Sequence, residues 1–216
     1  MSDTALKLKA QRWAAEPMPR RANAEEQLGA IMAVSRAVAE GGALPETLDH
    51  IAEEAAALLR AKAAAILLRP NEWGSGLSVA GCFGLTPLYA EYLNVERPME
   101  VGMGPSGRAI KTGHPVAVHD MELDPSVAPW REIARREGFR SLVSVPLTLA
   151  DGSVLGVLNV YREQPRVWSQ GEIDLLQVLG DHAAIAVRIA ALLDDSRRQI
   201  DGLSLLVRSL RDQGHE

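Results

Sequence analysis

The chain has 216 residues, of which 47% are hydrophobic and 24% charged, the composition of an ordinary globular protein. Its formal net charge of −5 argues against a general nucleic-acid binder, which is normally basic. The single cysteine, Cys82, excludes an intramolecular disulfide and a cysteine-cluster metal site. No run approaches the roughly eighteen apolar residues of a membrane span, and the charged start is unlike a signal peptide. We therefore expect a cytoplasmic protein without direct nucleic-acid or membrane contacts.

Residues 1–21 differ in composition from the rest of the chain. They carry two prolines and two acidic residues against five basic ones, which are Lys7, Lys9, Arg12, Arg20 and Arg21. Such a terminus is typical of a flexible, solvated arm. A basic arm that contacts a membrane or a partner is the alternative.

Apolar residues recur at three- and four-residue spacing over residues 23–40 and over Leu44–Lys62, so both segments are predicted as helices. Strand-like runs and short helices then alternate. The predicted strands are Ala63–Leu68, Leu77–Phe83, Val116–His119, Ser141–Leu149 and Val154–Tyr161. The predicted short helices are Thr86–Leu93, Gly107–Lys111 and Trp130–Glu137. This order predicts an α+β fold with a mostly antiparallel sheet and flanking helices. Pro146 is expected where the strand needs no hydrogen-bond donor.

A long helix is predicted after Ser169, which with Glu172 forms a capping box. An alternating four- and three-residue register runs through it, and nine of its eleven positions are apolar, the exceptions being His182 and Ser196. The positions are Leu175, Leu179, His182, Ala186, Ile189, Leu193, Ser196, Ile200, Leu203, Val207 and Leu210. This pattern favours a coiled coil about 60 Å long. The half of this helix after Leu193 has nothing left in the chain to bury against except the N-terminal helix or a second copy.

Four segments resemble the GAF domain family. Gly104–Asp120, which reads Gly-Pro-Ser-Gly-Arg-Ala-Ile-Lys-Thr-Gly-His-Pro-Val-Ala-Val-His-Asp, resembles the middle of such a domain. Gly138–Leu147, Gly152–Val160 and Trp168–Val187 follow in the order and spacing of the family. The resemblance implies a five- or six-stranded sheet and a small-molecule pocket under the irregular middle segments. It also implies a homodimer through the helices at 23–40 and 172–210, and signalling along the last helix to an output domain or to a kinase or transcription partner. It divides the chain into an N-terminal arm, a domain at 22–190 and a helical extension at 191–216.

The family pocket would be lined by aromatic and small polar side chains. Ser141, Val143 and Val145 share one face of their predicted strand, and we expect that face to line the pocket. The candidate ligand-binding residues are Phe83, Tyr89, Tyr92, Ser106, Ile110, His119, Trp130, Phe139, Ser141, Val143 and Tyr161. They favour a small, largely apolar molecule with one or two polar groups. A closed core in a ligand-free dimerisation adaptor stays open as an alternative.

Catalytic and cofactor-binding GAF domains are poor matches. Ser106 stands where the free methionine sulfoxide reductases place a cysteine, and Arg140 stands where haem-binding members place a histidine. Of the cyclic-nucleotide signature only Trp168 and Glu172 remain. The five histidines lack the spacing of a metal site. We therefore expect a sensor of the bacterial regulator type, and no enzyme, cofactor or metal. A GAF-fold redox enzyme using Cys82 is the alternative.

Overall fold

The computed structural model describes residue 29 and residues 43–70 and 76–213. The predicted arm at 1–21 and, apart from Gly29, the predicted helix at 23–40 lie outside the described residues. The predicted strands are confirmed to within a residue or two at each end, whereas the helix predicted over Leu44–Lys62 ends at Leu58. The elements are α3 (Leu44–Leu58), β1 (Ala63–Leu68), β2 (Gly76–Phe83), α4 (Pro87–Glu91), η1 (Tyr92–Glu96), β3 (Met99–Glu100), α5 (Gly104–Thr112), β4 (Val116–Val118), η2 (Pro125–Trp130), α6 (Arg131–Glu137), β5 (Ser141–Thr148), β6 (Val154–Arg162) and α7 (Gln170–Gln213).

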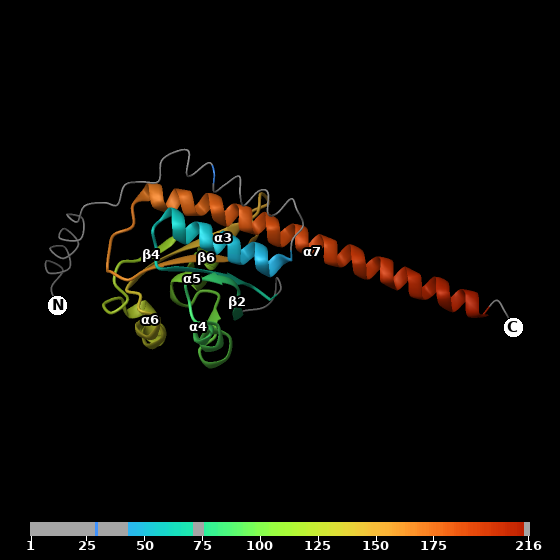
Figure 1. Cartoon of the computed structure of the whole chain (residues 1–216), viewed down its shortest axis with the longest axis horizontal. Helices are drawn as coiled ribbons and strands as arrows, with labels where there is room; N and C mark the ends of the chain where they lie inside the picture. The colour runs from blue at the N-terminus through green and yellow to red at the C-terminus, as the bar shows by residue number, and fades with distance from the viewer. Residues whose placement is uncertain (1–28, 30–42, 71–75, 214–216) are drawn as a thin grey trace.

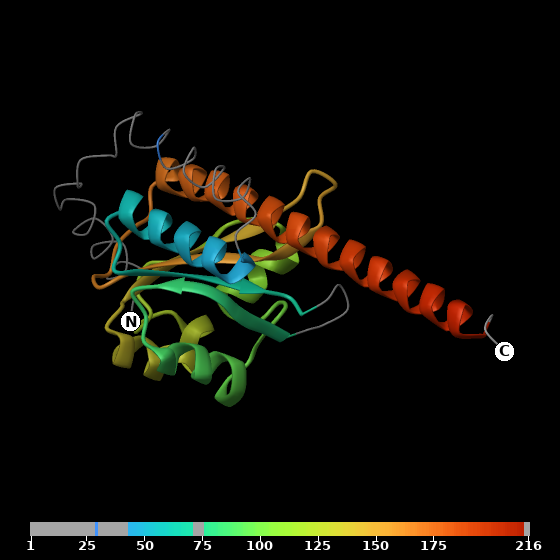
Figure 2. The same ribbon diagram turned by 45° about the vertical axis from the view of Figure 1, so that its right-hand side comes forward.

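One six-stranded sheet organises the domain, in the order β3-β2-β1-β6-β5-β4, and every pair is antiparallel. The long helices α3 and α7 lie on one face of the sheet (Figure 1). The opposite face is covered by the short helices of the irregular middle, as Figure 2 shows most clearly for α4 and α6. The predicted α+β class is confirmed, and the middle segments form a helical layer of their own.

The first turn of α7 is fixed by the capping box that the sequence predicts. The backbone N–H of Ser169 donates to the Glu172 carboxylate at 2.9 Å, and the N–H of Glu172 donates to Ser169 Oγ at 3.4 Å. Arg162, at the end of β6, pairs with Glu172 and also donates to the carbonyl oxygen of Leu59 just after α3. The end of α3 therefore lies beside the start of α7, and the two helices run antiparallel (Figure 1).

Helix α7 is buried in its first half and projects beyond the domain in its second (Figure 1). Leu179 and Ala186 of the predicted seam are buried, whereas Ile189 and Leu193 are exposed. The first half of the seam thus contributes to the core of the domain, whereas Ile189 and Leu193 are open to a partner.

The segment Gln170–Leu193 is long and apolar enough to cross a membrane by length and composition alone. The sequence expectation that no run approaches this criterion is therefore wrong. The same segment places Leu176 and Leu179 in the core, completely buried. Core helices meet the same criterion because one face must be strongly apolar, so the finding is weak support for a membrane contact.

Pro146 lies in the open stretch of β5, beyond the residues that pair with β4. That pairing ends at Ser144 opposite Val116. The carbonyl oxygen of Pro146 accepts a hydrogen bond from Gln177 of α7 at 2.9 Å, so this side of the residue points away from β6. The missing N–H is therefore not needed by the sheet, as the sequence predicts.

Candidate functional site

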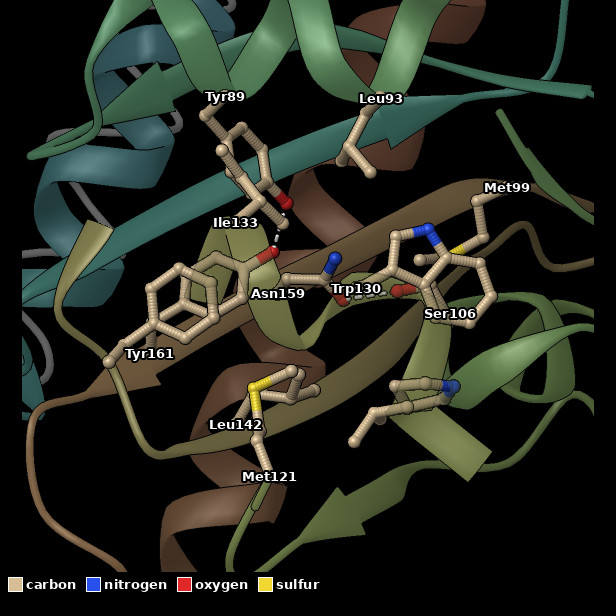
Figure 3. Close-up of a pocket in the computed structure, with 13 residues that line it drawn as sticks. Tyr89, Leu93, Met99, Ser106, Met121, Trp130, Ile133, Leu142, Asn159 and Tyr161 are labelled. Atoms are coloured by element: carbon tan, nitrogen blue, oxygen red, sulfur yellow. Dashed lines mark hydrogen bonds between the residues drawn. The ribbon is translucent and has the colours of Figure 1, made fainter. Parts of the chain in front are cut away.

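A small cavity lies between the sheet and its cover of short helices. Its free volume is about 20 Å³, which is enough for one or two water molecules. Figure 3 shows the side chains around it. They are Tyr89, Leu93, Met99, Pro105, Ser106, Met121, Val127, Trp130, Ile133, Phe139, Leu142, Asn159 and Tyr161. Because so little space is free, a molecule larger than one or two waters can enter only if the cover of short helices moves.

Buried polar groups from α5, β5 and β6 form one side of this cavity. Ser106 Oγ donates to the side-chain oxygen of Asn159 at 3.1 Å, and it lies 3.4 Å from Ser144 Oγ. All three residues are at most 1% exposed. Buried polar groups carry a high cost when they are unpaired, so this network holds the Asn159 amide in one orientation.

The hydroxyls of Tyr89 and Tyr161 hydrogen-bond to each other next to Asn159 (Figure 3). The Phe139 ring packs on both, with ring centroids 6.5 Å from Tyr89 and 4.3 Å from Tyr161. Burial raises the pKa of both tyrosines above its ordinary value near 10, because the phenolate would lose its hydration. Both groups are therefore neutral hydroxyls at physiological pH.

The raised tyrosine pKa values predict a loss of stability in alkali. Tyr89 and Tyr161 ionise more readily in the unfolded chain, so their contribution is complete below pH 10 and falls as the pH rises through the unfolded value. An alkaline titration followed by phenolate absorbance should show two tyrosines that ionise only when the fold is lost. Phenolate absorbance from all three tyrosines of the folded chain near pH 10 would contradict this assignment.

The remaining walls of the cavity are apolar. Leu93, Met99, Trp130 and Ile133 are among the side chains that form them (Figure 3). No charged side chain of the described residues lines the cavity. Such a site favours an uncharged molecule, because an ion would leave water without a counter-charge.

Two of the hydrogen bonds that fasten the cover over the cavity come from Tyr92 and Trp130. The Tyr92 hydroxyl donates to the carbonyl oxygen of Pro129 at 3.1 Å, which joins η1 to η2. The indole N–H of Trp130 donates to the carbonyl oxygen of Arg97 at 3.3 Å. These bonds must break or shift when the cover opens.

Five of the predicted site residues line the cavity: Tyr89, Ser106, Trp130, Phe139 and Tyr161. The other six lie elsewhere. Phe83 on β2 is 39% exposed, and His119 is exposed beside the Arg166 carbonyl. Tyr92 fastens the cover, and Ser141 donates to the Gln164 carbonyl. Ile110 and Val143 are buried in the core outside the lining. Whether the five bind a ligand stays a prediction.

The prediction that the Ser141, Val143 and Val145 face of β5 lines the pocket is wrong. Val145 lies beside Gly180 of α7, on the helix side of the sheet, while Leu142 and Ser144 face α5 and the cavity. Ser141 and Val143 alternate with those two and therefore share the side of Val145. The sequence analysis also missed Asn159. The signal was an amide inside an otherwise apolar strand, since a buried amide requires partners.

Cys82 is separate from the cavity. It is partly buried on β2, and its backbone N–H donates to the Asp49 carboxylate at 2.7 Å. Burial, followed by the nearby Asp49 and Glu137 charges, raises the pKa of its thiol. A thiol is a poor nucleophile, so this environment does not favour redox catalysis. In the described part of the chain, no group of three or more His, Cys, Asp or Glu side chains could hold a metal ion.

Comparisons with known proteins place this arrangement in one family. Residues 43–187 match the family model of the GAF domain, and the chain belongs to that family. It is 25% identical over 193 residues to the methyl sulfide methyltransferase-associated sensor of Methanosarcina acetivorans. That match covers 89% of this chain and 19% of the relative, so the chain spans about a fifth of that protein's length.

Two solved structures illustrate the fold. The GAF domain of a phosphoenolpyruvate-protein phosphotransferase from Coxiella burnetii superimposes with a TM-score of 0.68 at 17% identity, covering 81% of this chain and 99% of that one. The free methionine-R-sulfoxide reductase of Neisseria meningitidis, solved with its substrate, gives a TM-score of 0.60 at 19% identity, covering 81% and 98%. These likenesses show the fold alone, and the fold hosts both sensors and an enzyme.

Proposed function

We propose that this chain is a sensory GAF domain whose cavity takes a small, uncharged, largely apolar molecule and whose long helix carries the response. The observation that supports this most strongly is the cavity itself. Its walls are apolar, and the Tyr89 and Tyr161 hydroxyls and the Asn159 amide offer hydrogen bonds to one polar group. The sensor named among the relatives is in keeping with this role.

The cavity is coupled to α7 through β6. Asn159 and Tyr161 line the cavity, and the next residue, Arg162, forms an ion pair with Glu172 in the first turn of α7. A ligand that separates the two tyrosine hydroxyls would displace this end of β6. A ligand shifts the helix only by its difference in affinity for the two arrangements, and the Arg162–Glu172 pair is the contact through which that difference reaches α7.

A matched pair of variants tests the ligand site. Phenol and cyclohexanol are suitable probes because both are uncharged rings with one hydroxyl. Tyr161→Phe removes one hydroxyl from the cavity, and we expect about tenfold weaker binding of the better probe by calorimetry. Tyr92→Phe makes the same chemical change in the cover, outside the lining, and should not weaken binding. Equal affinities in the wild type and the Tyr161→Phe variant would contradict the site.

The projecting half of α7 supports a homodimer. Ile189 and Leu193 are 39% and 50% exposed, on the part of the seam that the domain leaves uncovered. Replacing both by glutamate should convert a dimer at micromolar concentration into a monomer, because two charges would be buried in the seam. Arg188→Glu changes the net charge by the same amount at an exposed position and should leave the dimer intact. Light scattering measures both, and a monomeric wild type would remove this part of the proposal.

A further inference from the structure

A second and larger hollow lies on the other side of the sheet, between the first half of α7 and the open end of β5. Its volume is about 740 Å³. It shares no residue with the cavity under the short helices. Its lining residues are Gly113, Pro115, Thr148, Leu149, Ala150, Gln170, Ile173, Asp174, Gln177, Asp181 and Ile185. We call it the α7 groove.

The α7 groove combines apolar and acidic side chains. Leu149, Ile173 and Ile185 supply apolar surface, and Ile185 is 48% exposed. Asp174 and Asp181 are the charged residues of its described lining, each accepting a 2.8 Å hydrogen bond from the glutamine four residues earlier. Neither carboxylate has a cationic partner within the described residues. The groove therefore suits a segment that carries both apolar and basic side chains.

An added β-strand is a poor occupant for the α7 groove. The open edge of β5 contains Pro146, which has no N–H to donate, and its carbonyl oxygen already accepts a bond from Gln177. Side chains must therefore provide most of the binding.

The chain's own residues 1–21 have the complementary composition. They carry five basic residues against two acidic ones, together with Leu6, Leu8 and Trp13 as apolar side chains. Trp13 stands apart from the other aromatic residues, which all lie between Trp73 and Trp168. The acidic groove and the basic segment thus match in charge and in apolar character.

The length of the intervening chain permits the contact. Residues 22–42 separate this segment from Ala43, and even a continuous helix of that length spans about 30 Å. Helix α3 is only about 22 Å long, and its far end lies beside the first turn of α7 through Arg162. The segment can therefore reach the end of the groove at Gln170 and Ile173.

We propose that residues 1–21 bind in the α7 groove of the same chain, with Trp13 against Ile173, Ile185 and Leu149 and basic side chains beside Asp174 and Asp181. The groove is formed partly by α7, so occupation of the groove and the position of this helix are linked. The N-terminal segment is then an internal ligand of the signalling helix.

Photo-crosslinking in the full-length chain tests this proposal. With p-benzoylphenylalanine in place of Trp13, we expect a product of monomer size whose crosslinks map to residues 146–150 or 170–185. Neutralising the groove with Asp174→Asn and Asp181→Asn should lower the yield at least threefold, and added salt should lower it too. The control variant, Glu91→Gln with Glu96→Gln, removes two exposed charges from α4 and η1 and should keep the yield.

Three results would overturn the proposal. Crosslinks spread over other surfaces, or a yield that the groove variant does not change, would show that the segment does not bind there. Groove crosslinks found only between two chains would show that the occupant comes from a second copy. None of these outcomes affects the ligand site, because the groove residues do not line the cavity.

Discussion

Replacing Gly107 by alanine should destabilise the domain by about 3 kcal/mol. A Cβ at this position would lie 2.0 Å from the Glu100 carbonyl oxygen and 2.9 Å from the Gly102 nitrogen. Both are backbone atoms of the loop that holds α5 under the sheet, and Gly102 donates to the Gly107 carbonyl at 2.7 Å. Neither can move without breaking that loop. Gly107 is therefore required by close backbone packing.

Chemical and thermal denaturation measure the effect of Gly107→Ala. For a chain of this size the midpoint of thermal unfolding should fall by roughly 10 °C. Ser106, the neighbour of Gly107, bonds Asn159, so binding of the phenol probe should weaken as well. Gly76→Ala is the matched control, since no described atom lies within 4 Å of its Cβ position. A change below about 1 kcal/mol in Gly107→Ala would mean that α5 and its loop can relax freely.

Replacing Glu172 by alanine should cost about 3 kcal/mol or more. Its carboxylate pairs with Arg162 at 3.3 Å and Arg166 at 3.1 Å, and the three side chains are only 12–15% exposed. Both guanidinium groups also lie over the Trp168 ring, 5.2 and 5.7 Å from its centroid. Desolvation lowers the pKa of Arg162 to about 10, which leaves it protonated at neutral pH. The variant would leave two buried positive charges side by side.

The matched control is Glu163→Ala, which breaks an exposed pair with Lys62. An exposed ion pair contributes little, so this variant should lose about 0.5 kcal/mol or less. Urea denaturation of both variants gives the comparison. Similar losses in the two variants would show that the Glu172 cluster is not a buried charge network. If the cluster also transmits the signal, the Glu172→Ala variant should still bind the phenol probe, but this binding should no longer shift the position of α7.

The sequence predicted the strands and the start of α7 because each has a local signal. The Asp-Gly dipeptide between β5 and β6 and the capping pair Ser169 and Glu172 act over a few residues. The structure has a turn at the first, and it confirms the predicted capping box at the second. Tertiary packing adds detail that no local pattern contains. The strand predicted through His119 ends at Val118, and the helix predicted over Thr86–Leu93 becomes a short α-helix followed by a π-helical turn.

The face of β5 that meets the cavity could not be read from the sequence. Nearly every residue of this strand is buried, because helices cover the sheet on both sides. Alternation then separates two faces without identifying which is which. Asn159 breaks that symmetry on β6, since a buried amide needs partners. Tyr161 lies two residues later and therefore on the same face of β6, so the two residues together identify the face that meets the cavity. Ser144 lies opposite Asn159 in the register, and this identifies the corresponding face of β5.

Native mass spectrometry of the freshly purified full-length chain tests the central claim most directly. We expect a dimer that retains an uncharged small molecule in each chain, and we expect that mass to be lost in the Tyr161→Phe variant but not in Tyr92→Phe. An empty chain that also binds neither phenol nor cyclohexanol would contradict a sensory cavity. A retained mass that carries net charge would contradict the ligand class inferred from the uncharged lining.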